Sequence, residues 1–161
     1  MNTTDSLFQR GLAKILTEIF DGPPGSEAYL LNPGDPGMLA QLETIDAAAA
    51  SARPMPGKTT IASHVDHVWY GFTLMNRWAA GDEQAFAEAD WSASWQRGVV
   101  NDNEWRDLCG RLRRETEAWR KTVATRSDWD EVAAVGVISS AAHTAYHLGA
   151  IRQILAAMEI A

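Results

Sequence analysis

The sequence predicts an all-α protein: a four-helix bundle with one short accessory helix between the first two long helices. Apolar residues recur at steps of three and four along four long segments, which is the spacing of one face of an α-helix. No segment alternates apolar and polar residues as a half-buried strand does. The chain has 161 residues and no internal repeat, so residues 1–161 are expected to form a single domain.

The first predicted helix covers residues 5–20, where Phe8, Leu12 and Ile19 mark an apolar stripe that ends before the run DGPPG. A loop rich in proline and glycine follows. Residues 38–52, MLAQLETIDAAAASA, then predict the accessory helix. Alanine favours helix but leaves little bulk to bury, so we expect this helix to pack on the rim.

The second long helix is predicted from Thr59 or Thr60 to the residue before Gly81, because a hydroxyl after the Pro-Gly break can cap it. Residues 81–100 show scattered aromatic residues without a period and predict a long connection that could hold a helical turn. The third helix should start at Asn101 or Asp102, with a glutamate placed for a capping box. Its apolar stripe is Trp105, Leu108, Cys109, Leu112, Thr116, Trp119 and Val123.

The last helix is predicted to start between residues 132 and 136 and to run to the C-terminus. The long connections at residues 21–58 and 81–100 permit crossovers between parallel neighbours, so an up-down-up-down order is not required.

Composition excludes several classes of function. The net charge is −7, and the basic run RDLCGRLRRETEAWRK is interleaved with acids, so we expect no nucleic-acid partner. No run approaches 18 consecutive apolar residues, so no membrane partner is expected. The N-terminus lacks the pattern of a signal peptide, and the single cysteine, Cys109, excludes an intrachain disulfide. A cytoplasmic location fits these features.

The four histidines are confined to two predicted helices. His143 and His147 are four residues apart in SAAHTAYHLGAIRQ, so their imidazoles share one helix face and could bind one divalent metal ion. His64 and His67, in SHVDHVW, could each supply a third ligand, and on spacing alone a four-histidine site is also open. Metallopeptidase chemistry of the HExxH type is excluded because Thr144 stands where the glutamate would be.

These stretches resemble a known family. Over most of its length the chain is similar to the DinB/YfiT-like superfamily of metalloenzymes. The likeness lies in PMPGKTTIASHVDHVW, a long connection after it, and HTAYHLGAIRQ. The closing motif carries most of the likeness, and the match on the second helix is looser. The resemblance implies a four-helix bundle arranged up-down-down-up, with one histidine of the second helix and two of the last motif as metal ligands beside a water.

Carried over residue by residue, the resemblance assigns the two ligands of the last motif to His143 and His147. Counting from Gly57 assigns the third ligand to His67, which leaves His64 as a residue behind the ligands or an alternative ligand. The chain departs from the family where TT replaces the frequent Trp-Ser at the start of the second helix, and where GAIRQ replaces GQI.

The expected function is therefore that of a metal-dependent enzyme with an open three-histidine site, acting on a small molecule as a homodimer. The metal could be zinc, nickel, iron or another divalent ion. The wider family includes enzymes that use low-molecular-weight thiols, such as mycothiol-dependent maleylpyruvate isomerase and bacillithiol transferases, so the site would activate a thiol for transfer or a water for hydrolysis. Tyr146 could donate a proton there. Trp91 and Trp95 would anchor the connection or, if it folds over the metal, form an apolar wall. The alternative is a non-catalytic, metal-binding or stress-linked dimeric bundle.

Overall fold

The computed structural model describes residues 3–54 and 59–160, and this part of the chain contains helices and no strand. Its long helices are α1 (Thr3–Asp21), α4 (Ile61–Ala79), α5 (Asp102–Thr125) and α6 (Glu131–Ile160). Its short helices are α2 (Met38–Glu43), α3 (Ala47–Ser51) and the 3-10 turn η1 (Ala93–Trp95). Residues 55–58, which hold the Pro-Gly step used to count to His67, lie outside the described residues.

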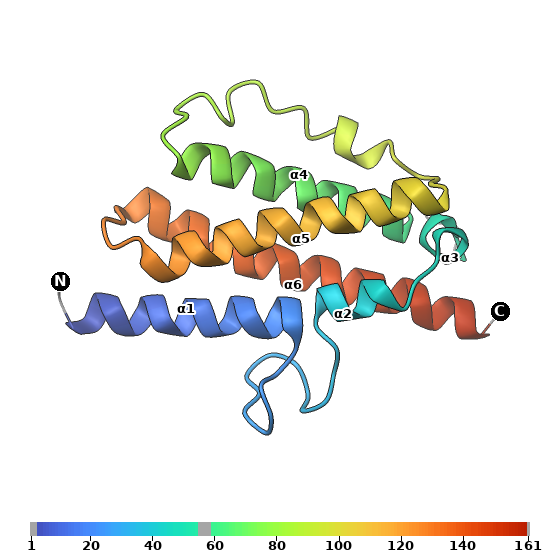
Figure 1. The fold of residues 1–161 in the computed structure, drawn as a ribbon, viewed down its shortest axis with the longest axis horizontal. Helices are drawn as coiled ribbons and strands as arrows, with labels where there is room; N and C mark the ends of the chain where they lie inside the picture. Colours follow the sequence, from blue (N-terminus) through green and yellow to red (C-terminus); the bar gives the residue numbers. More distant parts are fainter. Residues whose placement is uncertain (1–2, 55–58, 161) are drawn as a thin grey trace.

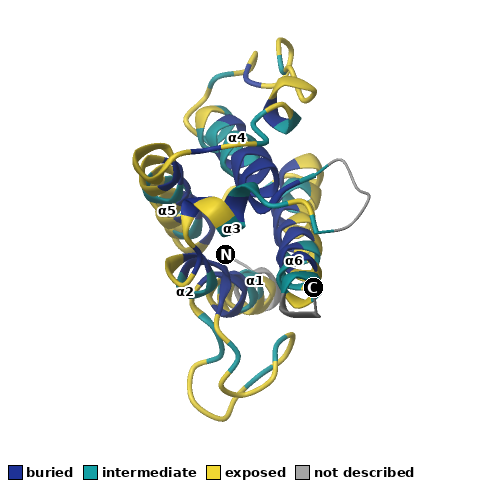
Figure 2. Cartoon of the chain, turned by 90° about the vertical axis from the view of Figure 1, so that its right-hand side faces the viewer, coloured by how far each residue is buried: buried dark blue, intermediate teal, exposed yellow. Residues whose placement is uncertain are grey.

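The long helices lie side by side, and their directions follow from the chain trace (Figure 1). Helices α1 and α6 run toward the right of that view, whereas α4 and α5 run toward the left. The connection between α4 and α5 therefore returns along the length of the molecule. Helix α5 contacts α4 and α1, and α6 contacts the same two helices. Viewed end-on, their buried faces point inward (Figure 2).

The helix starts follow the local signals in the sequence. Thr60 and Ser63 form a reciprocal cap at α4, in which the Thr60 hydroxyl accepts from the Ser63 backbone N–H and the Ser63 hydroxyl accepts from the Thr60 N–H. Asn101 and Glu104 do the same at α5. Asp130 accepts from the N–H of residue 133, so α6 begins one residue before the predicted range. The first two predicted starts are confirmed.

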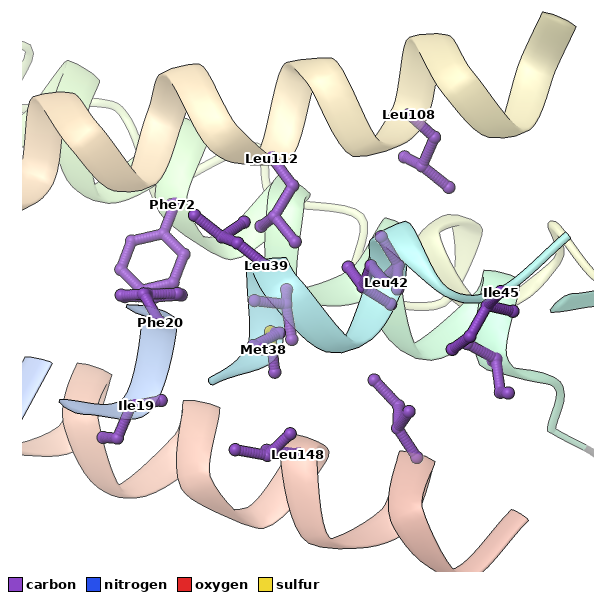
Figure 3. Packing of buried hydrophobic residues seen from close by; sticks show 14 of the residues in the cluster. Ile19, Phe20, Met38, Leu39, Leu42, Ile45, Phe72, Leu108, Leu112 and Leu148 are labelled. Carbon is purple, nitrogen blue, oxygen red and sulfur yellow. The ribbon is translucent and has the colours of Figure 1, made fainter. Parts of the chain in front are cut away.

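The predicted accessory helix is wrong in two respects, because it is two helices and one of them lies in the core. Thr44 ends α2 by donating its hydroxyl to the carbonyl of residue 41, and Asp46 caps α3 by accepting from the N–H of residue 49. Met38, Leu39 and Leu42 of α2 are buried, and Figure 3 places them between α5 and α6. The apolar half of the segment thus fills the core, and the alanine half forms α3.

The remaining core agrees with the predicted helix faces. The α5 stripe is buried at Trp105, Leu108, Leu112, Thr116, Trp119 and Val123, while Cys109 is partly buried. On α1, Leu16 and Ile19 are fully buried, although Phe8 at the start of the stripe is exposed. Among the described residues, no helix has the length and apolar character needed to cross a membrane.

Candidate metal centre

The four histidines meet at the contact between α4 and α6. His64 and His67 lie in the first turns of α4 after the Thr60 cap, and both are buried. His147 is also buried, whereas His143, one turn earlier on α6, is exposed. The long-range packing of α4 on α6 therefore joins two pairs of residues that are about 80 positions apart in sequence, His64 to His147 being 83 residues.

Three imidazole nitrogens converge on one point. The Nε2 atom of His143 lies 3.0 Å from Nε2 of His147 and 3.2 Å from Nε2 of His67. Two nitrogens that each lie about 2.0–2.1 Å from one ion, at angles of about 90–110°, are separated by about 2.9–3.4 Å. The observed spacings match this separation. His67, His143 and His147 therefore lie close together and could bind a metal ion.

A hydrogen bond to the long connection sets the protonation of His67. The Ser94 hydroxyl donates to the carbonyl oxygen of Trp91 at 2.8 Å. It can therefore only accept from His67, whose Nδ1 lies 2.8 Å away. His67 thus carries its proton on Nδ1 and directs the lone pair of Nε2 to the common point. This is the arrangement by which an outer hydrogen bond orients a metal-binding histidine.

His64 contacts the far nitrogen of His147, as Ser94 contacts the far nitrogen of His67. The Nδ1 atoms of the two rings are 2.8 Å apart. When Nδ1–H of His147 donates to His64, Nε2 of His147 keeps a lone pair at the common point, as Nε2 of His67 does. His64 is thus a hydrogen-bond partner of a candidate ligand, and its ring lies outside the three-histidine group.

Hydrogen bonding alone cannot satisfy the three converging nitrogens. Nε2 of His143 can hold one proton, which cannot point along two contacts at once, toward His67 and toward His147. A cation at the common point would accept all three lone pairs. The donor set therefore fits a divalent ion of the kind that imidazoles bind.

The electrostatics keep the cluster neutral at physiological pH. Burial, with further contributions from His143 and His64, lowers the pKa of His67 to about 4. Burial and the other three histidines lower the pKa of His147 to about 3. Burial also lowers the pKa values of His64 and His143. The imidazole rings are therefore neutral near pH 7, and each keeps one unprotonated nitrogen that is available as a ligand.

The connection between α4 and α5 packs over one side of the cluster. Trp95 stacks on His67 with ring centroids 4.4 Å apart and 25° between planes, and Trp91 tilts against the same ring at 5.7 Å. Arg97 is tied to the buried carboxylate of Asp66 at 2.9 Å. The sequence predicts an apolar wall of Trp91 and Trp95 if the connection folds over the site, and this placement agrees with it. Asp66 faces the connection through its ion pair with Arg97.

Tyr146 contacts one candidate ligand, His147, but largely faces solvent. Its side chain is 70% exposed, and its ring meets His147 edge-on at 5.1 Å. A cavity between α4, α6 and the connection borders His143, and Tyr146 is not among the described residues that line it. A role for its hydroxyl as proton donor stays a prediction.

Sequence reasoning missed Ser94 and Arg97, which position the centre from the connection. Ser94 is one of two serines in the connection at residues 81–100, which shows no periodicity, and its partner His67 is 27 residues away. Arg97 gave no local signal for its pairing with Asp66, 31 residues earlier.

Compared with known proteins, the chain matches no family model, no curated protein and no solved structure.

Proposed function

We propose that this chain is a metal-dependent enzyme that acts on a small molecule, with one divalent ion held by His67, His143 and His147. The observation that carries the proposal is the convergence of their Nε2 atoms, with neighbouring contacts at 3.0 and 3.2 Å. Ser94 and His64 support it because each occupies the far nitrogen of a candidate ligand.

The surroundings of the histidines favour a reactive site over a closed structural one. Three protein ligands leave a metal position open, and an ion bound there would lower the pKa of a water or a low-molecular-weight thiol. Trp95 and Trp91 pack against the ring of His67, while the exposed His143 leaves the other side accessible. A thiol would lead to S-transfer and a water to hydrolysis, so the two reactions are distinguished by their dependence on thiol.

We also propose membership of the DinB/YfiT-like superfamily and a bundle arranged up-down-down-up. The helix directions in Figure 1 support this arrangement, since α4 and α5 run parallel and α1 and α6 run against them. The position of His67 after the Thr60 cap and the pair His143 and His147 support the family. A cytoplasmic location remains a prediction from composition.

A homodimer through α6 is the arrangement that we propose for the chain. Val135, Ile138, Ala142 and Tyr146, which we call the α6 outer face, recur at steps of three and four and are exposed. The exposed fractions of Val135 and Ile138 are 57% and 53%. A helix that is apolar on all sides is normally covered on all sides. A second copy related by a twofold axis would cover this face.

The experiment is metal analysis of protein purified without nickel affinity. We expect about one metal ion per chain. His143→Ala should lose it, because two remaining protein ligands are too few to hold the ion. Tyr146→Phe, on the same helix, is the matched control and should keep the metal. No metal in the wild-type chain, or equal metal in His143→Ala, contradicts the proposal.

Activity is tested next on the metal-loaded chain. Turnover of electrophiles that requires an added low-molecular-weight thiol supports S-transfer, and turnover without a thiol supports hydrolysis. Stoichiometric metal without turnover in either series favours the alternative, a non-catalytic metal-binding dimer.

A further inference from the structure

A cavity of about 170 Å³ adjoins the metal centre between α4, α6 and the long connection. Its walls include Val68, Phe72 and Met75 from α4 and Phe86 and Trp91 from the connection. His143 also lines it, so the cavity borders the one candidate ligand that is exposed. Trp91 links the two sites as well, because its ring contacts His67.

Two helical glycines line this cavity from facing helices, Gly71 on α4 and Gly136 on α6. A Cβ atom at Gly71 would lie 3.9 Å from its nearest neighbour, in Trp91, and one at Gly136 would lie 3.6 Å from Cε of Met75. Both are ordinary contact distances, so close approach of the backbones does not require glycine. Glycine costs a helix interior about 1 kcal/mol relative to alanine. What these glycines provide is empty volume beside His143.

The lining is suited to an uncharged group. Among the described residues that line the cavity there is no lysine, arginine, aspartate or glutamate. The Ser140 hydroxyl is already engaged, because it donates to the carbonyl of Val137 at 2.7 Å and accepts from Nε1–H of Trp119 at 2.9 Å. A charged group would lose hydration there without gaining a partner of opposite charge among these residues. A dry apolar cavity of about 150 Å³ is large enough for benzene.

We propose that this cavity binds an uncharged apolar group of the substrate, of about the size of a benzene ring, while the substrate's polar group lies at the histidine centre. The inference rests on the proposed function for the polar half and on the cavity itself for the apolar half. It assigns the substrate class as a small molecule with an aromatic or compact aliphatic end. The glycines then determine specificity through the space that they leave.

The test uses two hydroxamates as probes, benzohydroxamate and acetohydroxamate, which share one metal-binding head and differ in the apolar group. On zinc-loaded protein, calorimetry should give benzohydroxamate an affinity at least about tenfold higher, as expected for burying a phenyl group. Gly136→Leu, which fills the cavity, should remove this preference and leave acetohydroxamate within about twofold of wild type.

Gly11→Leu is the matched control, since Gly11 is a helical glycine of α1 with open space around it. It should keep the preference for benzohydroxamate. Should Gly136→Leu fail to fold, the double variant Gly71→Ala/Gly136→Ala replaces it, because both Cβ atoms fit and the preference should still fall. Equal affinities of the two hydroxamates for wild type, or equal loss in the Gly136 and Gly11 variants, overturns the proposal.

Benzene binding to the metal-free protein separates this inference from the proposed function. Measured by saturation-transfer NMR, benzene should bind wild type and not Gly136→Leu, whether or not zinc binds. Benzene binding without stoichiometric zinc would contradict the metal centre and keep the cavity assignment. Stoichiometric zinc with no benzene bound and no preference between the hydroxamates would contradict the cavity assignment alone.

Discussion

The Nδ1 atoms of His64 and His147 lie 2.8 Å apart, although the residues are separated by 83 positions in the chain. This contact continues through His143 and His67 to the Ser94 hydroxyl and then to a backbone carbonyl of the connection. The histidines thus form one series of contacts: the Nε2 atoms of His67, His143 and His147 converge, and the Nδ1 atoms of His67 and His147 contact Ser94 and His64. The series predicts different roles for the two histidines of α4.

Replacing His64 should weaken metal binding without removing the site. In His64→Ala the ring of His147 loses the partner of its Nδ1, which typically costs about 10–100-fold in affinity. His67→Ala removes a ligand and should abolish stoichiometric binding. Zinc titrations against a competing chelator measure both constants. If His67→Ala binds zinc as tightly as wild type and His64→Ala does not, the two histidines have been assigned in the wrong order.

Metal binding should be visible in tryptophan fluorescence, because Trp95 touches three of the four histidines. Its ring centroid lies 4.4 Å from that of His67, 5.3 Å from His64 and 5.7 Å from His147. Titration with cobalt(II) should quench the emission, and Trp95→Phe should lose most of the quenching. Trp129→Phe is the control, since that ring packs on Trp119 and Arg126. Quenching that survives in Trp95→Phe but disappears in Trp129→Phe contradicts the site.

The ion pair between Arg97 and Asp66 should hold the connection over the centre. Burial raises the pKa of the Asp66 carboxyl, and the charge and hydrogen bond of Arg97 oppose that rise. Arg97→Met leaves a buried carboxylate without its cation, so we expect a loss of about 2–3 kcal/mol in unfolding free energy, below the value for a fully buried pair. Hydrogen exchange at residues 91–95 should increase.

The double variant Asp66→Asn/Arg97→Met tests whether the charge is responsible. It removes the unpaired carboxylate, so most of the lost stability should return. Equal destabilisation in the single and double variants would assign the effect to packing of the Arg97 side chain.

The parts of the fold that follow from short-range chemistry could be predicted from the sequence. The caps at Thr60 and Asn101 are side-chain to backbone contacts within three residues, so the residue types in one short stretch of sequence predict them. The break between α2 and α3 uses the same chemistry at Thr44 and Asp46, but the apolar pattern runs through it and hides the interruption.

The candidate site also has one part that could be predicted from the sequence and one part that could not. The pairing of His143 with His147 is a helical repeat, so the sequence indicates it. The contact of Ser94 with His67 and the cavity between Gly71 and Gly136 depend on how distant segments pack. A single sequence holds no periodic signal for either. The resemblance assigned the third ligand to His67 and not to His64. The geometric reason for this assignment comes from the packing of α4 on α6, which brings His67 to His143 and leaves His64 behind His147.

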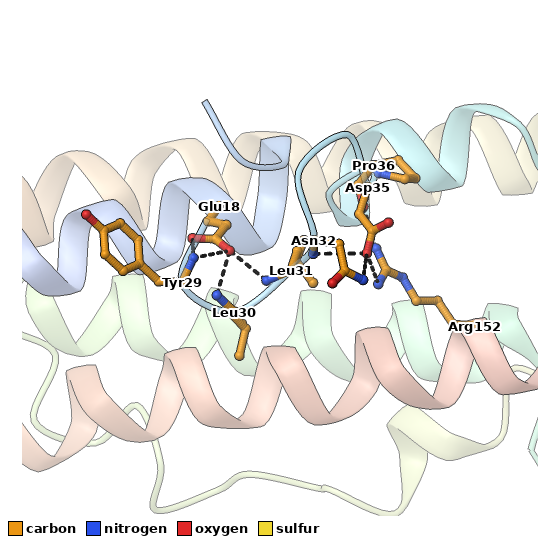
Figure 4. A network of polar contacts seen from close by, with 8 residues as sticks. All are labelled: Glu18, Tyr29, Leu30, Leu31, Asn32, Asp35, Pro36 and Arg152. Atoms are coloured by element: carbon orange, nitrogen blue, oxygen red, sulfur yellow. Dashed lines mark hydrogen bonds and ion pairs between the residues drawn. The ribbon is translucent and has the colours of Figure 1, made fainter. Parts of the chain in front are cut away.

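A buried carboxylate predicts a pH dependence of stability away from the metal centre. Glu18 is 1% exposed, and its carboxylate accepts from the backbone N–H groups of Tyr29, Leu30 and Leu31 (Figure 4). Burial would raise the pKa of Glu18, but the hydrogen bonds from Leu31, Leu30 and Tyr29 prevail and lower it below 4.5. The carboxylate therefore stabilises the fold above pH 4.5, and this contribution is lost as the pH falls through the lowered pKa.

Glu18→Gln should cost roughly 2–3 kcal/mol at pH 7, since hydrogen bonds to a charged acceptor are replaced by weaker ones. The difference from wild type should shrink as the pH falls below 4.5 and through the lowered pKa of Glu18, because the wild-type carboxyl then takes up a proton. Urea unfolding across this range measures it. Glu27→Gln, at an exposed ion pair with Lys14, should show little cost at any pH. A difference that grows on acidification would contradict the lowered pKa.

The α6 outer face predicts the oligomeric state. Light scattering should give wild type twice the chain mass of 17.6 kDa. Val135→Glu/Ile138→Glu places two carboxylates from each copy at a twofold contact and should give a monomer. Glutamate suits an exposed helix surface, so the unfolding free energy of the monomer should change by less than about 0.5 kcal/mol per site.

The matched control for the dimer is Val99→Glu, an equally apolar residue that is 76% exposed on the connection. It should leave the mass unchanged. The double variant should also keep its zinc, because Val135 and Ile138 lie on a different side of α6 from His143 and His147. A wild-type monomer, or a double variant that remains dimeric, contradicts the interface. Loss of zinc together with loss of the dimer would instead mean that the second copy is needed to hold α6 against α4, so that the metal centre depends on dimerisation.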